Sequence, residues 1–174
     1  MATTKWTLDP THSELHFKVK HLMITNVTGS FSVINASVEA DDNNFTHAKV
    51  AFTADPKSIS TNNEQRDGHL RTADFFETEK YPEIKFESTD YNANTGKING
   101  NLTIRGVAKP VTLDVEFHGT TKDPWGNEKA GFSLSGKISR KDWGLNYNAT
   151  LETGGVLLSD DVKIIAEVQF AKAA

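Results

Sequence analysis

Four polar side chains in one short segment, Arg66, Asp67, His69 and Arg71, are the residues of this chain best suited to binding chemistry. Asp67 and Arg71 are four positions apart, so on a helix they share a face and can form an ion pair. The His69 ring can donate a hydrogen bond to a hydroxyl, phosphate or quinone oxygen. The group is either a structural network that ties the segment to its neighbours or a contact with the polar head of a bound molecule. The network is the simpler interpretation.

A second group, Asp9, His12 and Ser13, contains the residue types of a hydrolase triad. The three residues lie within five positions on an Asp-Pro turn, and neither a nucleophile elbow nor an oxyanion glycine accompanies them. The spacing favours a turn that is capped by Asp9 and Ser13. We therefore predict no catalytic residues in this chain.

Spacing also argues against a metal site. His12 and His16 are four positions apart, which spans about 13 Å in a strand, whereas each ligand of one ion lies only about 2 Å from it. The chain has no cysteine, which excludes disulfides and thiolate ligands. We expect neither a metal site nor a required cofactor.

The elements that position these groups are strands, because apolar residues fall on every second position through most of the chain. Leu15, Phe17 and Val19, for example, alternate with charged or polar residues. Such strands have one dry face and one wet face and are typical of antiparallel sheets. The same alternation is found in the stretches Val50 to Ala54, Ile98 to Ile104, Val111 to Phe117, Phe132 to Ile138 and Val162 to Phe170.

Turn residues separate these strands at short intervals. Asn94 to Gly96 and Arg105 to Pro110 each join two successive strands as a hairpin. Successive hairpins form a meander, which favours an up-and-down barrel over a Greek key. With 174 residues the chain fits one domain, residues 1–174. The sequence thus predicts an all-β antiparallel barrel.

Residues 63–76 break the alternation and predict a short helical insert. Asn62 or Asn63 can cap a helix whose first turn carries acidic residues, which favour the positive end of the helix dipole. A second short helix is expected to begin at Thr72 and to present two adjacent phenylalanines. We expect this insert to lie across one mouth of the barrel.

Composition excludes some classes of partner. The net charge is −4 and the pI is near 5.8, so no nucleic-acid partner is expected. No stretch approaches the roughly eighteen apolar residues of a membrane span, and the amino terminus lacks the apolar core of a secretory signal. As written, the chain is expected in the cytoplasm; if a signal has been removed from it, the periplasm is expected.

Longer segments of the chain resemble the YceI-like family of bacterial lipid-binding barrels. The similarity covers almost the whole chain, and its most specific segments are Arg-Asp-Gly-His-Leu-Arg at 66–71 and Leu-Thr-Ile-Arg-Gly at 102–106. The other segments that carry the resemblance are Trp6 to Ser13, Leu15 to Phe17, His21 to Met23, Gly29 to Phe31, Asp74 to Phe76, Tyr81-Pro82, Pro110 to Leu113 and Arg140 to Leu145.

This resemblance implies an eight-stranded antiparallel up-and-down barrel of the lipocalin-like kind. It implies that the lumen binds a polyisoprenoid, an isoprenoid quinone or a similar long-chain amphiphile without catalysis. It also implies a homodimer in some members and frequent export to the periplasm. The inward strand faces mix bulky residues with Ala54, Gly100, Gly136 and Ala166, and these small residues are expected to leave open space in the lumen.

We expect the apolar tail of the ligand to occupy the lumen and its polar head to lie near His69. The residues expected to contact the ligand are Phe17, Val19, Phe31, Phe52, His69, Leu70, Phe75, Phe76, Leu113, Val115, Phe117, Phe132, Leu134, Ile164 and Val168. The choice of inward residues depends on strand register, because a slip of one residue inverts a strand.

Lipid binding for transport, storage or sequestration is the function that we expect. Two alternatives are open on the sequence alone. A barrel without a ligand would act as a stress-related protein-interaction module. An enzyme acting on a prenylated substrate would need an inward-facing cluster of titratable groups, which the alternation pattern does not contain.

Overall fold

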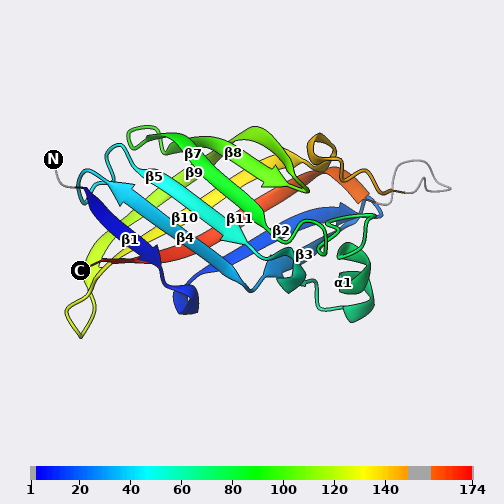
Figure 1. The fold of residues 1–174 in the computed structure, drawn as a ribbon, viewed down its shortest axis with the longest axis horizontal. Coiled ribbons are helices and arrows are strands. Elements are labelled where there is room, and N and C mark those ends of the chain that lie inside the picture. The colour runs from blue at the N-terminus through cyan, green and yellow to red at the C-terminus, as the bar shows by residue number, and fades with distance from the viewer. Residues whose placement is uncertain (1–2, 149–157, 174) are drawn as a thin grey trace.

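The strands join edge to edge in one antiparallel sheet, drawn in Figure 1 from a computed structural model that describes residues 3–148 and 158–173. The strands are β1 (Thr4–Leu8), β2 (Glu14–His21), β3 (Thr25–Phe31), β4 (Ile34–Ala40), β5 (Lys49–Ala54), β6 (Ile59–Ser60), β7 (Ile84–Asn92), β8 (Lys97–Ile104), β9 (Val107–Lys122), β10 (Glu128–Ser139) and β11 (Leu158–Lys172). The helical elements are α1 (Glu64–Leu70) and the short 3-10 turns η1 (Pro10–His12), η2 (Pro56–Ser58) and η3 (Arg140–Trp143).

The sheet closes into a barrel because its two ends meet. The hydrogen-bonded order runs β1-β4-β5-β7-β8-β9-β10-β11, and β11 pairs back onto β1. The other three segments, β2, β3 and β6, continue strands of this ring. β2 continues β1, because both pair with β11, and β3 continues β4, because β3 pairs with β2 as β4 pairs with β1. β6 continues β5, because β6 pairs with β3 as β5 pairs with β4. The result confirms the predicted eight-stranded up-and-down barrel.

Tight turns connect the long strands. The predicted Asn94 to Gly96 turn joins β7 to β8 as expected. The next turn is shorter than predicted, because it consists only of Arg105 and Gly106, and Pro110 lies inside β9 opposite Asn101. Arg105 and Gly106 both have left-handed φ angles, of 52° and 72°. Two such residues are enough to reverse the chain, so the strand begins earlier than the proline suggested.

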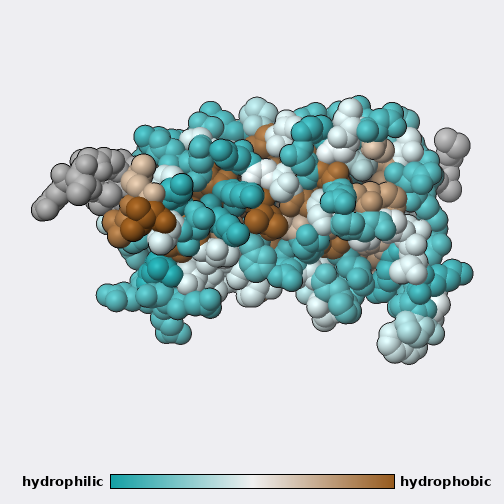
Figure 2. Space-filling model, turned by 180° about the vertical axis from the view of Figure 1, so that it is seen from behind, coloured by the Kyte–Doolittle hydropathy of each residue, from teal (hydrophilic) through white to brown (hydrophobic). Residues whose placement is uncertain are grey.

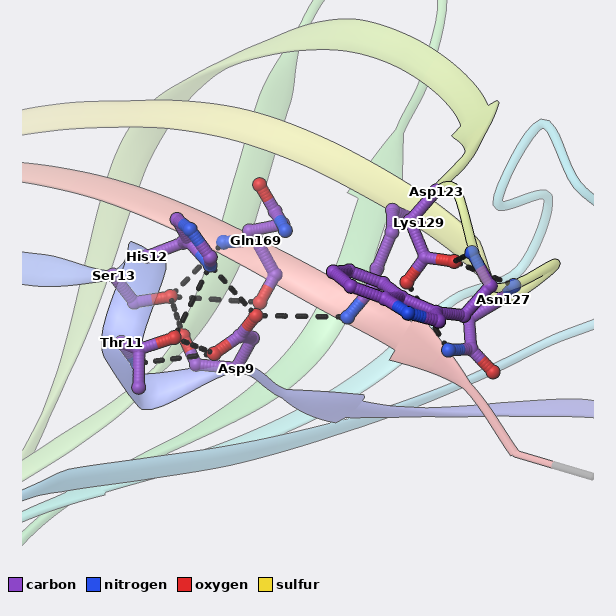
Figure 3. A network of polar contacts seen from close by, with 9 residues as sticks. Asp9, Thr11, His12, Ser13, Asp123, Asn127, Lys129 and Gln169 are labelled. Atoms are coloured by element: carbon purple, nitrogen blue, oxygen red, sulfur yellow. Dashed lines mark hydrogen bonds and ion pairs between the residues drawn. The ribbon is translucent and has the colours of Figure 1, made fainter.

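A polar network around Asp9 fixes the break between β1 and β2 (Figure 3). The Asp9 carboxylate accepts hydrogen bonds from the Thr11 amide at 3.0 Å and the Thr11 hydroxyl at 2.6 Å, and it lies 2.8 Å from His12 Nδ1. Ser13 Oγ donates to the Asp9 carbonyl at 2.7 Å and accepts from the Gln169 amide at 3.0 Å. Since backbone atoms engage the serine hydroxyl, these residues form the predicted capped turn.

Acid stability should depend on Asp9. Hydrogen bonds from Thr11 and His12 hold the pKa of the Asp9 carboxyl well below its ordinary value of 3.8. A lowered folded-state pKa stabilises the fold above the unfolded-state pKa, and this contribution is lost as the pH falls below about 4. In urea titrations from about pH 5 to pH 2, the unfolding free energy of Asp9→Asn should therefore decline less steeply than that of the wild type. Equal slopes would contradict this assignment.

Helix α1 begins where the sequence predicts. Asn63 is its N-cap, and the Asn63 side chain accepts a hydrogen bond from the Arg66 amide at 2.9 Å. Its first turn carries the acidic residues Glu64 and Asp67. This acidic first turn stabilises the positive end of the helix dipole.

The second helix that was expected from Thr72 is not formed, and residues 72–76 lie in turns. The Phe76 amide donates to the Leu70 carbonyl and the Glu77 amide to the Thr72 carbonyl. These bonds span six and five residues, whereas α-helical bonds span four. The prediction was wrong because it considered local helix propensity and not this wider turn. The turn places the rings of Phe75 and Phe76 in the cavity wall.

Candidate functional site

The barrel contains a cavity of about 410 Å³, which falls in the range of roughly 300–1,000 Å³ that is usual for small-molecule sites. Its wall consists mainly of aliphatic and aromatic side chains from the inward faces of the strands. The few polar side chains in the wall include Thr61, Arg66, His69, Arg140 and Tyr147. The cavity therefore suits a mostly apolar molecule with a small polar part.

Strand register turns most of the predicted site residues toward this cavity. On β2, for example, Phe17 lies opposite Ile164 of β11, and both line the cavity. The predicted residues found in its wall are Phe17, Val19, Phe31, Phe52, His69, Leu70, Phe75, Phe76, Leu113, Val115, Phe132, Leu134, Ile164 and Val168. Their contact with a ligand remains a prediction.

Phe117 is the exception, because it belongs to an aromatic plug that fills one end of the barrel. The plug consists of Trp6, Phe45, Phe117 and Phe132. The Phe117 ring stacks on Phe132 with 5.0 Å between centroids and meets Phe45 edge-on at 5.2 Å. Trp6 lies 5.1 Å from Phe45, and both are almost completely buried. Phe117 therefore closes the barrel behind the cavity.

Phe45 is a structural residue that the sequence reasoning missed. It follows Asp42 and other turn residues between β4 and β5, where an apolar anchor was not expected. Its φ of 64° is left-handed, and its ring is only 1% exposed. The available signal was a lone aromatic residue inside a polar turn, which is a common sign of a loop that folds back onto the core.

Most polar groups of the cavity wall lie toward the opposite end, whereas Tyr91 on β7 packs against the apolar cluster that contains Trp6 and Phe45. Lys172, at the end of β11, pairs with Trp6 of the plug, whereas Leu158 begins β11 at the other end. The carbonyls of Leu158 and Tyr147 both accept hydrogen bonds from the Arg140 guanidinium. Figure 1 shows α1 at this same end of the barrel.

His69 on α1 lies in an aromatic setting at this polar end. Its Nε2 is 2.7 Å from a carboxylate oxygen of Asp74. Its ring makes edge contacts with Phe75 at 5.2 Å and Tyr147 at 4.8 Å between centroids. All three rings border the cavity. His69 therefore occupies the position that was expected for contact with a polar head.

The predicted ion pair between Asp67 and Arg71 is replaced by two separate anchors. The buried Asp67 carboxylate accepts hydrogen bonds from the Thr61 amide and hydroxyl at 2.8 and 2.6 Å. The Arg71 guanidinium donates to the carbonyls of Lys57 and Ile59 at 3.1 and 3.3 Å. Both residues bind chain segments outside the helix, because α1 packs against β6. The network interpretation is therefore correct for these two residues.

Arg140 is a wall residue that sequence reasoning did not identify as functional. It is only 4% exposed. Its guanidinium donates to the carbonyls of Ser159, Leu145 and Tyr147 at 2.9, 2.5 and 2.8 Å, and to that of Leu158 at 3.5 Å. Burial lowers the pKa of this guanidinium because desolvation disfavours the charged form. Its partners lie far from it in the chain or in irregular segments, so no local pattern identified them.

The expectation that small inward residues leave open space does not hold for Ala54, Gly100 and Gly136, which lie outside the cavity wall. Ala166 borders the cavity. At Gly100, a Cβ atom would lie 2.5 Å from the Phe86 ring, and at Gly136 it would lie 2.3 Å from a Leu113 methyl group. Neighbouring side chains therefore lie flat over these glycines. The two glycines contribute to the open volume indirectly, because large side chains on adjacent strands can fold back against the wall.

The two glycines should differ in their tolerance of alanine. A Cβ at Gly100 would also lie 2.5 Å from the backbone carbonyl oxygen of Glu87, which cannot rotate away, whereas the main obstacle at Gly136 is a flexible leucine end. We expect Gly100→Ala to lower the unfolding free energy by about 2 kcal/mol and Gly136→Ala by less than about 1 kcal/mol. Urea unfolding of both variants tests this order, and a reversed order would contradict it.

Two further findings concern the residues that the structure describes. No group of three or more His, Cys, Asp or Glu side chains is placed to hold a metal ion in residues 3–148 and 158–173. In the same ranges, no helix has the length and apolar character needed to cross a membrane.

Comparisons with known proteins agree with this fold. The Campylobacter jejuni YCEI protein is 37% identical, with a TM-score of 0.75 over 89% of this chain and 90% of that chain. Burkholderia cenocepacia BcnA is 21% identical, with a TM-score of 0.76 over 93% of this chain and 98% of that chain. A polyisoprenoid binding domain from Saccharophagus degradans is 20% identical, with a TM-score of 0.69 over 97% and 98%.

Relatives found by sequence have a higher identity than these solved structures. UPF0312 protein SA2479 of Staphylococcus aureus (strain N315) is 44% identical over 169 residues, which is 97% of this chain and 98% of that relative. The family model described as the YceI-like domain matches residues 6–170, nearly the full barrel. On these matches, this chain belongs to the YceI-like family.

Proposed function

We propose that this protein binds a polyisoprenoid, an isoprenoid quinone or a similar long-chain amphiphile in the barrel cavity, for transport, storage or sequestration. The observation that carries the proposal is the apolar cavity of about 410 Å³ between the aromatic plug and the polar end of the barrel. Binding alone accounts for this function, and the proposal includes no catalytic step.

Burial of hydrocarbon supplies the affinity. Each methylene group transferred from water to an apolar site contributes about 0.8 kcal/mol. Ten such groups would contribute roughly 8 kcal/mol, which corresponds to micromolar binding before the cost of association is subtracted. An apolar wall can therefore retain such a ligand with few polar contacts.

The distribution of polar groups supports one orientation of the ligand. The apolar tail would extend toward the aromatic plug, and the polar head would lie at the end where His69 and Tyr147 border the cavity. Arg66, which binds the Thr61 hydroxyl and carbonyl through Nε and Nη2 at 2.7 and 2.6 Å, borders the cavity as well. The Tyr147 hydroxyl and the Arg66 guanidinium can donate hydrogen bonds to a hydroxyl or carbonyl oxygen, whereas His69 Nε2 already lies 2.7 Å from the Asp74 carboxylate.

The comparison with known structures supports this class of ligand. The structural neighbour from Saccharophagus degradans is described as a polyisoprenoid binding domain. Its identity of 20% is low, but its barrel covers 97% of this chain. The hydrocarbon wall of the present cavity is what such a ligand requires.

Organic extraction of the purified protein followed by mass spectrometry tests the proposal. We expect about one prenyl lipid or other long-chain amphiphile per protein chain, or uptake of added prenylated quinone by protein from which lipid has been removed. A lipid-free extract together with no uptake of added lipid would contradict it. Chemical conversion of the added lipid would instead favour an enzyme.

A further inference from the structure

The turn between β2 and β3 presents three exposed apolar side chains in a row. Leu22, Met23 and Ile24 are 40%, 51% and 79% exposed, and none of them belongs to the cavity wall. Figure 2 shows a hydrophobic patch at the end of the molecule where β2 ends. Such a group of exposed side chains is unfavourable in water unless another apolar surface covers it.

The backbone of this turn is also unfavourable for its residues. The Ile24 amide donates to the His21 carbonyl at 3.2 Å, which closes a tight turn around Leu22 and Met23. These two central residues have left-handed φ angles of 54° and 66°. Hairpin turns with two left-handed residues strongly prefer Asn-Gly. This chain therefore has large apolar residues at two positions where asparagine and glycine would be more stable.

The turn lies beside the polar end of the cavity. His21, which precedes the turn, pairs with Leu158 of β11, and both residues border the cavity. The Tyr147 and Leu158 carbonyls are bound by the same guanidinium, that of Arg140. Tyr147 is 38% exposed and borders the cavity. An apolar layer in contact with this turn would therefore lie next to the polar end of the cavity.

Positive charge gathers on the outer wall behind this turn. Lys18, Lys163 and Lys137 occupy matched positions on β2, β11 and β10, so their side chains lie on one face of three adjacent strands. Neighbouring strands are about 4.8 Å apart, and like charges directly opposite each other are destabilising. Lys20 lies two residues nearer the turn on the same face of β2.

Acidic residues compensate this charge only in part. Asp161 binds Lys137 at 3.7 Å, and Asp160 binds Lys141 at 3.4 Å. Within the described ranges 3–148 and 158–173, Lys18, Lys20 and Lys163 have no ion-pair partner. A partner that combines negative charge with an apolar layer would compensate both the lysines and the exposed turn.

We propose that this end of the barrel docks on the surface of a lipid bilayer that contains anionic lipids. The side chains of Leu22, Met23 and Ile24 enter the boundary between headgroups and acyl chains, and Lys18, Lys20 and Lys163 bind lipid phosphates. Docking places the polar end of the cavity against the membrane. The bilayer contact goes beyond the proposed function, and only its use for loading lipid rests on that function.

Co-sedimentation of the full chain with vesicles tests the contact. We expect binding to vesicles of phosphatidylcholine mixed with phosphatidylglycerol, and much weaker binding to phosphatidylcholine alone. The variant Leu22→Asn/Met23→Gly should reduce the partition coefficient about tenfold. It should also raise the melting temperature, because it supplies the residues that the turn prefers. A loss of binding in a more stable protein cannot result from misfolding.

Charge variants and a matched control complete the test. Lys18→Gln and Lys163→Gln should each reduce binding to the anionic vesicles about fivefold, with less effect in high salt. Trp125→Ser, which removes an 83% exposed apolar side chain from the β9–β10 turn, should bind as the wild type does. Unchanged vesicle binding of Leu22→Asn/Met23→Gly would overturn the proposal.

Two other outcomes would also overturn it. The first is that the wild type binds neither kind of vesicle. The second is that the wild type forms a dimer in solution and that Leu22→Asn/Met23→Gly converts it to a monomer. The patch would then be an interface between two copies of the chain. Vesicles free of prenyl lipid keep this test separate from the proposed function. Docking on them can succeed even if the cavity binds no lipid.

Discussion

Ala166→Trp should abolish lipid binding while the barrel remains folded. Ala166 lies on β11 opposite Leu134 on one side and Leu15 on the other, and all three side chains border the cavity. An indole at this position occupies the space that the ligand tail needs. Since it enters open volume, it should cost less than the roughly 1–3 kcal/mol of overpacking a filled core. We expect the lipid recovered per chain to fall at least about tenfold, because the ligand loses most of its hydrocarbon burial.

The control for this variant is Ala51→Trp on the outer face of β5. Ala51 is exposed and lies outside the cavity wall, so it receives the same side chain without any loss of internal space. Its lipid content should equal that of the wild type. Circular dichroism and thermal unfolding establish that both variants are folded. An Ala166→Trp protein that is folded and carries the wild-type amount of lipid would show that the ligand does not occupy this cavity.

Arg140→Leu should cause the largest loss of stability. Its buried guanidinium binds four backbone carbonyls; those of Ser159, Leu145 and Tyr147 would lose this donor, whereas that of Leu158 keeps a hydrogen bond from the Asn148 side chain. Hydrogen bonds to charged groups contribute about 1.5–3 kcal/mol each, and an unsatisfied buried group adds its own desolvation cost. We expect the unfolding free energy to fall by about 4 kcal/mol or more, a large part of the roughly 5–15 kcal/mol of a typical domain. Urea unfolding of the wild type and the variant measures this loss of unfolding free energy.

Two further variants serve as comparisons for Arg140→Leu. Arg140→Lys should recover only part of the loss, because an ammonium group has three donors and does not have the planar geometry of a guanidinium. Lys141→Ala removes the neighbouring exposed ion pair with Asp160 and should cost less than about 1 kcal/mol. If Arg140→Leu were as stable as Lys141→Ala, the role of Arg140 in joining η3 and the following residues to β11 would be disproved.

The sequence by itself was sufficient for the strands in which the alternation was found, and for most of the cavity wall. Alternation at every second position determines which side chains share a face, because successive residues of a strand point to opposite sides. Once Phe17 faces inward, Val19 must face inward too, and both border the cavity. The cap of α1 was also local: Asn63 binds an amide three residues away. These features depend on neighbours in the chain, so the sequence pattern contains them.

Only the tertiary structure decided how the barrel ends and where its polar groups point. Phe45 and Phe117 fill one end because closure of the sheet brings separate turns and strands together. Asp67 binds Thr61 and not Arg71, because packing of α1 against β6 offers a nearer partner. Arg140 binds the carbonyls of Ser159 and Tyr147, which become its neighbours only when β11 pairs with β10 and the residues after η3 fold back. Contacts between distant segments arise from closure, and periodicity along one strand does not contain that information.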